Sequence, residues 1–589
     1  MTERIHISVA WPYANGDLHV GHLAGAYLPA DIFARYHRLK GSQVLMVSGS
    51  DSHGTPISVE ADKRGVPPSE LFEHFHQRFL TTQKAIGISY DLFTHTDTEN
   101  HHRVAQDIFL RLYENEYLYR KTERQLYSES EGRFLPDRYV EGTCPICGFG
   151  QARGDQCDNC GNLLDALDLI DPRSKTDGTT PVVRETEHFF LDLPALAEPI
   201  LAYLTEHAGH WRPNVYKFAR NYVEGGLKGR AVTRDIDWGI PVPLEGWSDK
   251  RLYVWFEAVM GYLTASIEWA VVQGAPEAWK SWWYDPAVHG YVFIGKDNIP
   301  FHTVIWQAEL MGVERLYETD GDKHLNLPYD VPANEFMNVE GAQLSKSRNW
   351  AIWLPDLLER YDPDAIRFYI ASVMPETRDS EFSWDDFVSR NNDELVATWG
   401  NLANRVTSFA HRHWDGQVPA PNELGPDDRA LLAEIESGFD KIGAEIEAVR
   451  LRAGLQEALR LARQVNAYLD HAPWFSVIKE DKLAAATTVY TALQAINQLK
   501  LLFSPYLPFS SERLHRALGF DQPLFGDQQI VTVEEANSSH QVLTYQPETG
   551  SGRWAPAELP AGQRLAEPAP LYRKLEPEIA EQERARLGG

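Results

Sequence analysis

All four cysteines of the chain lie in one short segment, with the pattern Cys144-x2-Cys147-x9-Cys157-x2-Cys160. Two close pairs in one segment are typical of a metal site and not of a disulfide framework. Four thiolates suit a tetrahedral Zn²⁺ ion and leave no position open for a catalytic water. We therefore expect one structural zinc ion per chain, with four buried free thiols as the alternative.

A second candidate site is His19-Val-Gly21-His22, which follows a strand-like segment and a glycine-containing loop and opens a predicted helix. The N-terminus of a helix offers free N–H groups and partial positive charge. Imidazoles placed there can donate hydrogen bonds to a triphosphate, and Gly21 lets a flat base approach the backbone. Taken alone, two histidines in such a motif are more often surface or helix-capping residues.

Far downstream, Lys346 stands between the hydroxyls of Ser345 and Ser347 in the segment Leu344–Arg348. A lysine on such a loop can neutralise the charge that develops on a leaving pyrophosphate. An ordinary exposed loop accounts for these residues alone. Asp51 is a third candidate, because it ends the apolar run Val44–Val47 and a carboxylate at the end of a buried strand needs a partner.

The elements that position these residues alternate between strands and helices, which predicts an α/β fold with a doubly wound, Rossmann-type parallel sheet. Ligands bind such sheets at the carboxyl ends of the strands, where each of the polar clusters falls. Leucine and alanine at helical spacing between 451 and 469 predict a helical bundle in the C-terminal part. We expect the following parts: 1–120, first half of the Rossmann domain; 121–230, inserted Cys₄ knuckle domain; 231–325, second half; 326–390, the region of the Lys346 loop; 391–535, helical bundle; 536–589, C-terminal tail.

The length of 589 residues is too great for one core, so several domains are expected. The net charge of −28 argues mildly against a nucleic-acid partner, although a local basic face can still serve one. No apolar run is long enough to span a membrane, and residues 1–8 lack the apolar region of a secretory signal. These features predict a cytoplasmic protein.

The pair formed by His19-x-Gly21-His22 and the Ser345-Lys346-Ser347 segment resembles the two signatures of class I aminoacyl-tRNA synthetases. Further segments resemble the methionine-specific branch: AWPYANG at 10–16, GSDSHGT at 49–55, YVWFEA at 253–258 and FIGKDNIPFH at 293–302. The likeness runs from about residue 5 to residue 520. It implies activation of methionine with ATP and Mg²⁺, followed by transfer of the methionyl group to its tRNA.

The resemblance also assigns roles to individual residues. His19, His22 and Lys346 would be catalytic, and Gly21, Gly295, Asp297, Ser345, Lys346 and Ser347 would bind ATP. The methionine pocket would be formed by Trp11, Tyr13, Asp51, Trp255, Ala258, Tyr262, His302 and Ile305. Asn401, Arg405 and Trp474 would read the anticodon. The chain lacks the C-terminal dimerisation module of some members, so a monomer is expected.

Two residues depart from the family pattern. Gln343 stands where the signature has a further lysine, so one pyrophosphate contact is weakened or supplied by Arg348. Trp11 stands where many members have leucine, which could alter the pocket. Four alternatives remain. One is a non-catalytic tRNA-binding paralogue, and another is a synthetase for isoleucine, valine or leucine, which would need a larger insertion. The others are a cysteine-specific enzyme and an enzyme that adenylates a methionine-like metabolite.

Overall fold

A seven-stranded sheet with the order β14-β13-β1-β2-β3-β18-β17 forms the centre of the N-terminal half. The computed structural model describes residues 2–136, 139–154, 157, 159–160, 164–345 and 349–588. The five strands from β14 to β3 are parallel, and β18 and β17 add to the β3 edge in antiparallel pairing. The strands are β1 (Arg4–Val9), β2 (Gln43–Ser50), β3 (Leu92–His95), β13 (Val288–Gly295), β14 (Ala333–Asn334), β17 (Asp527–Glu534) and β18 (Ser539–Gln546).

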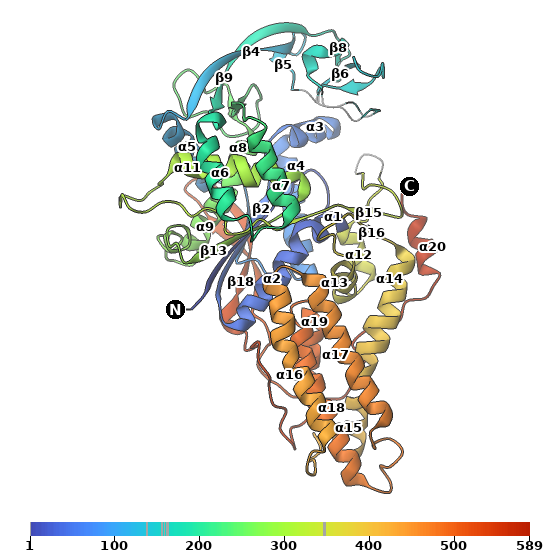
Figure 1. The fold of residues 1–589 in the computed structure, drawn as a ribbon. Helices are drawn as coiled ribbons and strands as arrows, with labels where there is room; N and C mark the ends of the chain where they lie inside the picture. Colours follow the sequence, from blue (N-terminus) through green and yellow to red (C-terminus); the bar gives the residue numbers. More distant parts are fainter. Residues whose placement is uncertain are drawn as a thin grey trace.

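Helices cover both faces of this sheet, as expected for a doubly wound fold (Figure 1). On one face, Ile5 and Ile7 pack in a core shared with α2 and α4. On the other, Leu45 and Val47 pack with α5, α9 and α11. The helices around the sheet are α1 (Val20–His22), α2 (Leu28–Lys40), α3 (Thr55–Arg64), α4 (Pro68–Ile86), α5 (Glu99–Glu114), α8 (Val254–Glu257), α9 (Gly261–Val272), α10 (Lys280–Trp283) and α11 (Trp306–Val313).

The helix after the HxGH motif is continuous across Pro29. A π-helical turn (Leu23–Tyr27) joins α1 to α2, and Pro29 occupies the first turn of α2. Within such a turn the amide of Leu28 bonds to the carbonyl of Leu23, five residues earlier. The proline therefore falls where its missing N–H costs little, which explains why the helix is not broken.

The inserted region forms a long antiparallel ribbon that arches over the N-terminal half, which carries the catalytic residues expected from the sequence and is called the catalytic half below (Figure 1). The ribbon strands are β4 (Leu118–Ser128) and β9 (Val182–Leu191), flanked by β5 (Arg133–Phe134) and β10 (Arg230–Ala231). The cysteines lie in and around a small sheet of β6 (Val140–Thr143), β7 (Ala152–Arg153) and β8 (Ile170–Ser174). The way back to the main sheet runs through α6 (Ala197–Glu206), α7 (Pro213–Glu224), β11 (Thr233–Arg234) and β12 (Arg251–Leu252).

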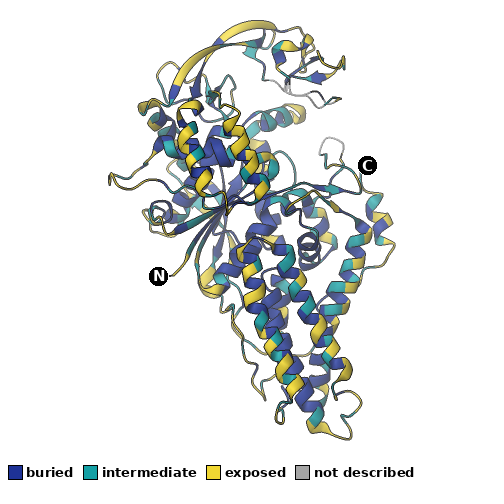
Figure 2. Ribbon diagram, viewed as in Figure 1, coloured by how far each residue is buried: buried dark blue, intermediate teal, exposed yellow. Residues whose placement is uncertain are grey.

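The C-terminal half is a helical bundle whose inner faces are buried (Figure 2). Its helices are α15 (Asn401–His413), α16 (Pro426–Glu447), α17 (Leu451–His471), α18 (Lys482–Phe503) and α19 (Pro508–Ala517). The connection to the sheet contains β15 (Met337–Val339), β16 (Ser380–Phe382), α12 (Leu354–Arg360), α13 (Pro363–Ser372) and α14 (Trp384–Arg390). The fold class expected from the sequence is confirmed: a Rossmann-type sheet, an insertion with a cysteine cluster and a helical bundle.

The expected boundary between the bundle and the tail at residue 535 falls inside the β17–β18 hairpin. This hairpin belongs to the central sheet, where Leu543 and Thr544 pair with β3. The remaining chain passes along the bundle and ends in α20 (Ile579–Arg584), which packs on α14 in the connection between the sheet and the bundle; its Arg584 bonds to Glu340 at 3.0 Å. Local periodicity could not show this, because the partners of the hairpin lie more than 400 residues away.

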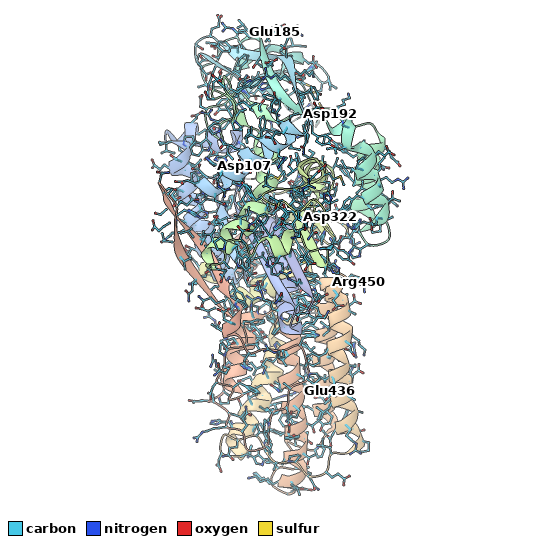
Figure 3. All side chains as sticks on the ribbon, turned by 90° about the vertical axis from the view of Figure 1, so that its left-hand side faces the viewer. Asp107, Glu185, Asp192, Asp322, Glu436 and Arg450 are labelled. Atoms are coloured by element: carbon cyan, nitrogen blue, oxygen red, sulfur yellow. The ribbon has the colours of Figure 1, made fainter. Side chains whose placement is uncertain are left out.

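Negative charge is spread over every part of the molecule. Figure 3 shows Glu185 on the ribbon, Asp107 and Asp322 on the catalytic half, and Glu436 on the bundle. Within the described residues, no helix is long and apolar enough to cross a membrane.

Candidate active site

A cavity of about 530 Å³ lies at the carboxyl ends of β1 and β13. Its walls bring together segments that are up to 330 residues apart in the sequence. Most of the described candidates for ATP binding and catalysis line it, together with the front of the expected methionine pocket: Trp11, Tyr13, His19, Gly21, His22, Trp255, Gly295 and Asp297. Gln343 and Leu344 close the cavity from the side of the second signature segment.

The two histidines of the first signature are fixed by backbone hydrogen bonds. The amide of Gly21 donates to Nδ1 of His19, and the amide of His19 donates to Nδ1 of His22, both at 3.1 Å. The two rings stack with their centroids 3.7 Å apart. Since Nδ1 accepts in both rings, each neutral imidazole carries its proton on Nε2. Both side chains are therefore prepared to donate from Nε2.

The two signature segments pack directly against each other. The amide of Val20 bonds to the carbonyl of Ile352, and that of Leu354 bonds to the carbonyl of Leu18. A Cβ atom at Gly21 would lie 2.6 Å from the end of the Leu344 side chain, so a larger residue here would require that side chain to shift. Lys346 and Ser347 lie outside the described residues, as does Arg348, whereas Ser345 pairs with Trp350 across the base of their loop.

Asp297 lies in the short helical turn (Lys296–Asn298) that follows β13, and it faces the same cavity. Burial raises the pKa of its carboxyl group. A Cβ atom at Gly295 would approach Asp297 Oδ1 to 2.9 Å, so the glycine leaves room for this carboxylate. The residue is exposed beside the end of a parallel strand, where its carboxylate can accept hydrogen bonds from the hydroxyls of a ligand.

Trp11 occupies space that two glycines leave open. Cβ atoms built at Gly49 and Gly261 would lie 2.2 Å and 2.7 Å from its ring. The indole packs edge-on against Tyr262, and its buried Nε1 has no hydrogen-bond partner. The tryptophan at position 11 is therefore accommodated by the small residues Gly49 and Gly261.

The remaining aromatic residues form a wall between the cavity and the protein interior. Trp255 stacks on Phe301 with ring centroids 4.2 Å apart, and Tyr13 packs edge-on against Trp255. Ala258, Tyr262, His302 and Ile305 are buried behind this wall and do not line the cavity.

His302 and Tyr262 are held in one arrangement by hydrogen bonds. Nδ1–H of His302 donates to the carbonyl of Asn298 at 3.0 Å, so its Nε2 accepts from the hydroxyl of Tyr262 at 2.7 Å. Burial lowers the pKa of His302 to about 4, which keeps the imidazole neutral. The expected methionine pocket is therefore polar but uncharged where Tyr262 and His302 form its wall, and an uncharged wall suits a thioether.

Asp51 follows β2 in a loop that pairs with the loop after β1. Its amide donates to the carbonyl of Pro12, and its carbonyl accepts from the amide of Ala14. The side chain is almost fully buried. Burial and the nearby charge of Glu257 raise the pKa of Asp51 well above its usual range. This carboxylate therefore lies where a bound cation would compensate it.

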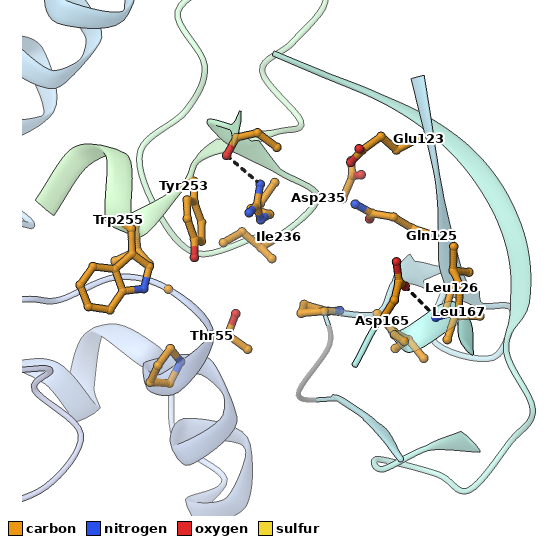
Figure 4. Close-up of a pocket in the computed structure, with 18 of the residues that line it drawn as sticks. Thr55, Glu123, Gln125, Leu126, Asp165, Leu167, Asp235, Ile236, Tyr253 and Trp255 are labelled. Atoms are coloured by element: carbon orange, nitrogen blue, oxygen red, sulfur yellow. Dashed lines mark hydrogen bonds between the residues drawn. The ribbon is translucent and has the colours of Figure 1, made fainter. Parts of the chain in front are cut away.

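A second cavity of about 490 Å³ opens between the ribbon and the catalytic half. Tyr13 and Trp255 line both cavities, so the two are neighbours. Figure 4 shows the polar side chains of Glu123, Gln125 and Asp165 on the ribbon side, facing Tyr253 and Trp255. The sequence did not predict this second opening, because its walls come from the insertion and from the catalytic half together.

The four cysteines come together as expected for a metal site. The Sγ atoms are 3.9 Å apart in the pair Cys144–Cys160 and 3.6 Å apart in the pair Cys147–Cys157. All four lie within 4.8 Å of one another. A tetrahedral zinc with Zn–S bonds of about 2.3 Å places its sulfurs about 3.8 Å apart, so this geometry can hold the ion.

At the distal end of the bundle, the three candidates for anticodon recognition are neighbours with unequal exposure. Asn401 and Arg405 are exposed on α15, and the Arg405 guanidinium lies 5.4 Å from the ring of Trp474. Trp474 itself is buried, and its Nε1–H donates to the carbonyl of Leu469. The exposed aromatic is the next residue, Phe475, with 71% of its surface accessible, which the sequence analysis missed.

A buried group of histidines and carboxylates behind the aromatic wall was not predicted from the sequence. Glu257 lies between His53 and His101, and His53 also contacts Asp97. The signal was available, because His53 and Glu257 belong to the segments that carry the family resemblance. Their contact depends on the fold, since they are 204 residues apart.

Comparisons with known proteins agree with this architecture. Residues 5–407 match the family model described as tRNA synthetases class I (M), and residues 418–549 match the anticodon binding domain of methionyl tRNA ligase. Proteins named methionine–tRNA ligase from Thermomicrobium roseum and Roseiflexus sp. are 59% and 53% identical, over 100% of this chain and 99% of theirs.

Among solved structures, Mycobacterium tuberculosis methionyl-tRNA synthetase in complex with methionyl-adenylate superposes with a TM-score of 0.77 at 24% identity. The match covers 97% of this chain and 100% of that one, and it shows that the fold is shared. Taken with the family model over residues 5–407 and the full-length relatives, these likenesses show that the chain belongs to the methionine–tRNA ligase family of class I tRNA synthetases.

Proposed function

We propose that this chain catalyses the ATP-dependent joining of L-methionine to its tRNA. In the first step, the methionine carboxylate attacks the α-phosphate of ATP, which gives methionyl-adenylate and pyrophosphate. In the second, a hydroxyl of the terminal adenosine of the tRNA attacks the activated carbonyl and AMP leaves. The observation that carries this proposal is the cavity that joins the first signature, the base of the second and the aromatic wall.

No covalent enzyme intermediate is needed, so catalysis consists of positioning and charge stabilisation. The Nε2–H groups of His19 and His22 would donate to phosphate oxygens that gain charge in the transition state. Lys346 would neutralise the leaving pyrophosphate, with Ser345 and Ser347 beside it. Asp297 would accept hydrogen bonds from the ribose hydroxyls, Gly21 and Gly295 would leave room for the nucleotide, and Mg²⁺ would accompany ATP.

Methionine would bind with its ammonium at Asp51 and its side chain against the aromatic wall. Sulfur–aromatic contacts are favourable, and Trp11, Tyr13 and Trp255 on the cavity and Tyr262 behind them offer such contacts without charge. Ala258, His302 and Ile305 lie behind these rings. Entry of the side chain would require the rings to move, because they separate these residues from the cavity.

The bundle tip would bind the anticodon of tRNA(Met). Asn401 and Arg405 can read base edges, Trp474 supports them from behind, and Phe475 offers an exposed ring for stacking. The four cysteines would hold one structural zinc ion. We further propose a monomer that acts in the cytoplasm, where translation supplies its substrate.

Amino-acid-dependent exchange of pyrophosphate into ATP, measured with each of the twenty amino acids and without tRNA, tests the first step. Exchange with methionine alone, followed by charging of tRNA(Met), is expected. His22→Ala should lower the exchange rate about 10²–10³-fold, the usual effect of removing one transition-state donor. Absence of exchange with every amino acid would refute the proposal and favour a tRNA-binding paralogue in which Gln343 matters.

A further inference from the structure

Behind the methionine pocket lies a buried cluster of His53, Glu257 and His101. Glu257 ends α8, the helix that carries Trp255, and Ala258 follows it. Its two carboxylate oxygens are each engaged: Oε1 lies 2.9 Å from Nδ1 of His53, and Oε2 lies 2.8 Å from Nε2 of His101. All three side chains are at most 2% exposed. The cluster therefore fixes Glu257 in one orientation, out of contact with water.

The hydrogen bonds determine where the charges lie. Both ring nitrogens of His53 face carboxylates, Nδ1 towards Glu257 and Nε2 towards Asp97 at 3.4 Å. Carboxylates only accept, so both nitrogens donate and His53 is positively charged. Burial alone would lower the pKa of His53, but Glu257 and Asp97 raise it to about 10.

Glu257 remains ionised in this setting. Burial alone would raise the pKa of its carboxyl, but His53 and His101 lower it to about 2. His101 donates to Glu257 from Nε2, and its Nδ1 lies 2.8 Å from the hydroxyl of Thr264 on α9. With His53 positive and Glu257 and Asp97 negative, these three groups carry a net charge of −1 before Asp51 is counted.

This negative charge acts on Asp51, two residues before His53. Oδ1 of Asp51 accepts the backbone N–H of His53 at 3.3 Å, which links the two side chains through one turn of chain. The ionisable groups that face Asp51 are Glu257, His53 and Tyr262. The potential that favours a proton on Asp51 also favours an ammonium group beside it, because both are cations at the same place.

We propose that Glu257 is a positioning residue that makes the pocket select ligands bearing an α-ammonium group. The proposal rests on the function proposed above, since it concerns the same methionine site. Glu257 does not reach the substrate; it acts through the potential at Asp51 and through the orientation of His53. His101 serves by holding Glu257 in place.

Two ligands separate this role from a structural one: L-methionine and 4-(methylthio)butanoate, which has the same side chain and carboxylate but no amino group. Binding of each to the wild-type protein and to Glu257→Gln is measured by titration calorimetry. We expect Glu257→Gln to weaken methionine binding about tenfold, equivalent to about 1.4 kcal/mol, and to leave binding of the analogue unchanged. In pyrophosphate exchange, the KM for methionine should rise by the same factor while kcat and the KM for ATP are retained.

Two variants serve as controls. His101→Gln keeps a donor for Glu257 and keeps its charge, so the preference for methionine should be retained. Glu268→Gln removes a different buried carboxylate, which bonds to Thr94 and His540, and should leave the affinity for both ligands unchanged. Equal weakening of both ligands by Glu257→Gln, an unchanged affinity for methionine, or loss of the preference in His101→Gln would overturn the proposal.

The wild-type protein provides a second measurement that needs no variant to fold. The ammonium of methionine competes with a proton for Asp51, so in titrations over a range of pH, binding should release protons to the buffer wherever this carboxyl is protonated in the free protein. Titrations in buffers of different ionisation enthalpy measure this release. Proton release with methionine and none with the analogue is expected, and equal release with both would contradict the coupling. Pyrophosphate exchange tests the proposed function separately, because methionine-dependent exchange can be observed whether or not Glu257 determines the preference for the ammonium group.

Discussion

Replacing Arg367 should uncouple the catalytic sheet from the helical bundle. This arginine on α13 is fully buried, and its guanidinium bonds to Oδ2 of Asp31 on α2 at 2.6 Å. It also donates to the carbonyls of Tyr506 and Pro505 in the bundle and of Ile86 and Gly87 beside the sheet. One side chain thus connects backbone segments of both halves, in surroundings that exclude water.

The magnitude follows from these contacts. Removing one partner of a buried ion pair typically costs about 3–5 kcal/mol, because the other charge remains buried. In Arg367→Met, Asp31 still forms an ion pair with Arg35 at 2.9 Å. The cost of losing the Asp31–Arg367 pair should therefore lie near the lower end of this range. The four carbonyls that lose a donor add to the cost, so we expect a loss of about 4 kcal/mol in the free energy of unfolding.

Urea denaturation followed by tryptophan fluorescence measures this loss, with Arg463→Met on the exposed face of α17 as the control. The control should change the stability by less than about 0.5 kcal/mol. The double variant Asp31→Asn, Arg367→Met should lose less than the sum of the two single variants, because each single variant already removes the same Asp31–Arg367 ion pair. A loss below about 1 kcal/mol for Arg367→Met, or strict additivity in the double variant, would refute this reasoning.

Three further predictions concern the bundle and the cysteine cluster. Burial lowers the pKa of Lys500 to about 7 from about 10.5. Between these pH values the unfolded chain binds more protons than the folded protein, so this group should make the stability rise with pH by up to about 1.4 kcal/mol per unit. Lys500→Met should remove that slope between pH 7 and 9, and an unchanged slope would contradict the prediction. Phe475→Ala should raise the KM for tRNA in charging about 5- to 150-fold, which is the range for loss of one stacked base, and should leave pyrophosphate exchange intact. As the control, Val271→Ala replaces an exposed apolar residue on the catalytic half and should change neither the KM for tRNA nor the exchange rate. Cys157→Ser should lower the zinc content measured by mass spectrometry from one ion per chain and destabilise the ribbon to proteolysis, and full retention of zinc would exclude the Cys₄ site.

Much of the candidate site could be predicted from short stretches of sequence. The spacing of Cys144 to Cys160 indicates a metal site, because two close cysteine pairs already bring their thiols within a few ångströms of each other. His19, His22 and Asp51 could be placed at strand ends for a similar reason, since an apolar strand and the polar turn after it are neighbours in the chain. The periodicity of α17 predicts the bundle, because a helix with one buried face has an apolar residue at every third or fourth position.

The tertiary structure alone decided the features that depend on distant partners. The β17–β18 hairpin joins β3 because backbone groups at an open sheet edge pair with whichever strand the fold delivers, and its own sequence carries no sign of that partner. Trp474 is buried while Phe475 is exposed, although both are apolar aromatics, because the fold packs the Trp474 ring against Phe409 of α15 and leaves most of the Phe475 ring in solvent. The charge of Glu257 likewise becomes relevant only when α8, α5 and the end of β2 meet, since an electrostatic potential depends on distances in space and not along the chain.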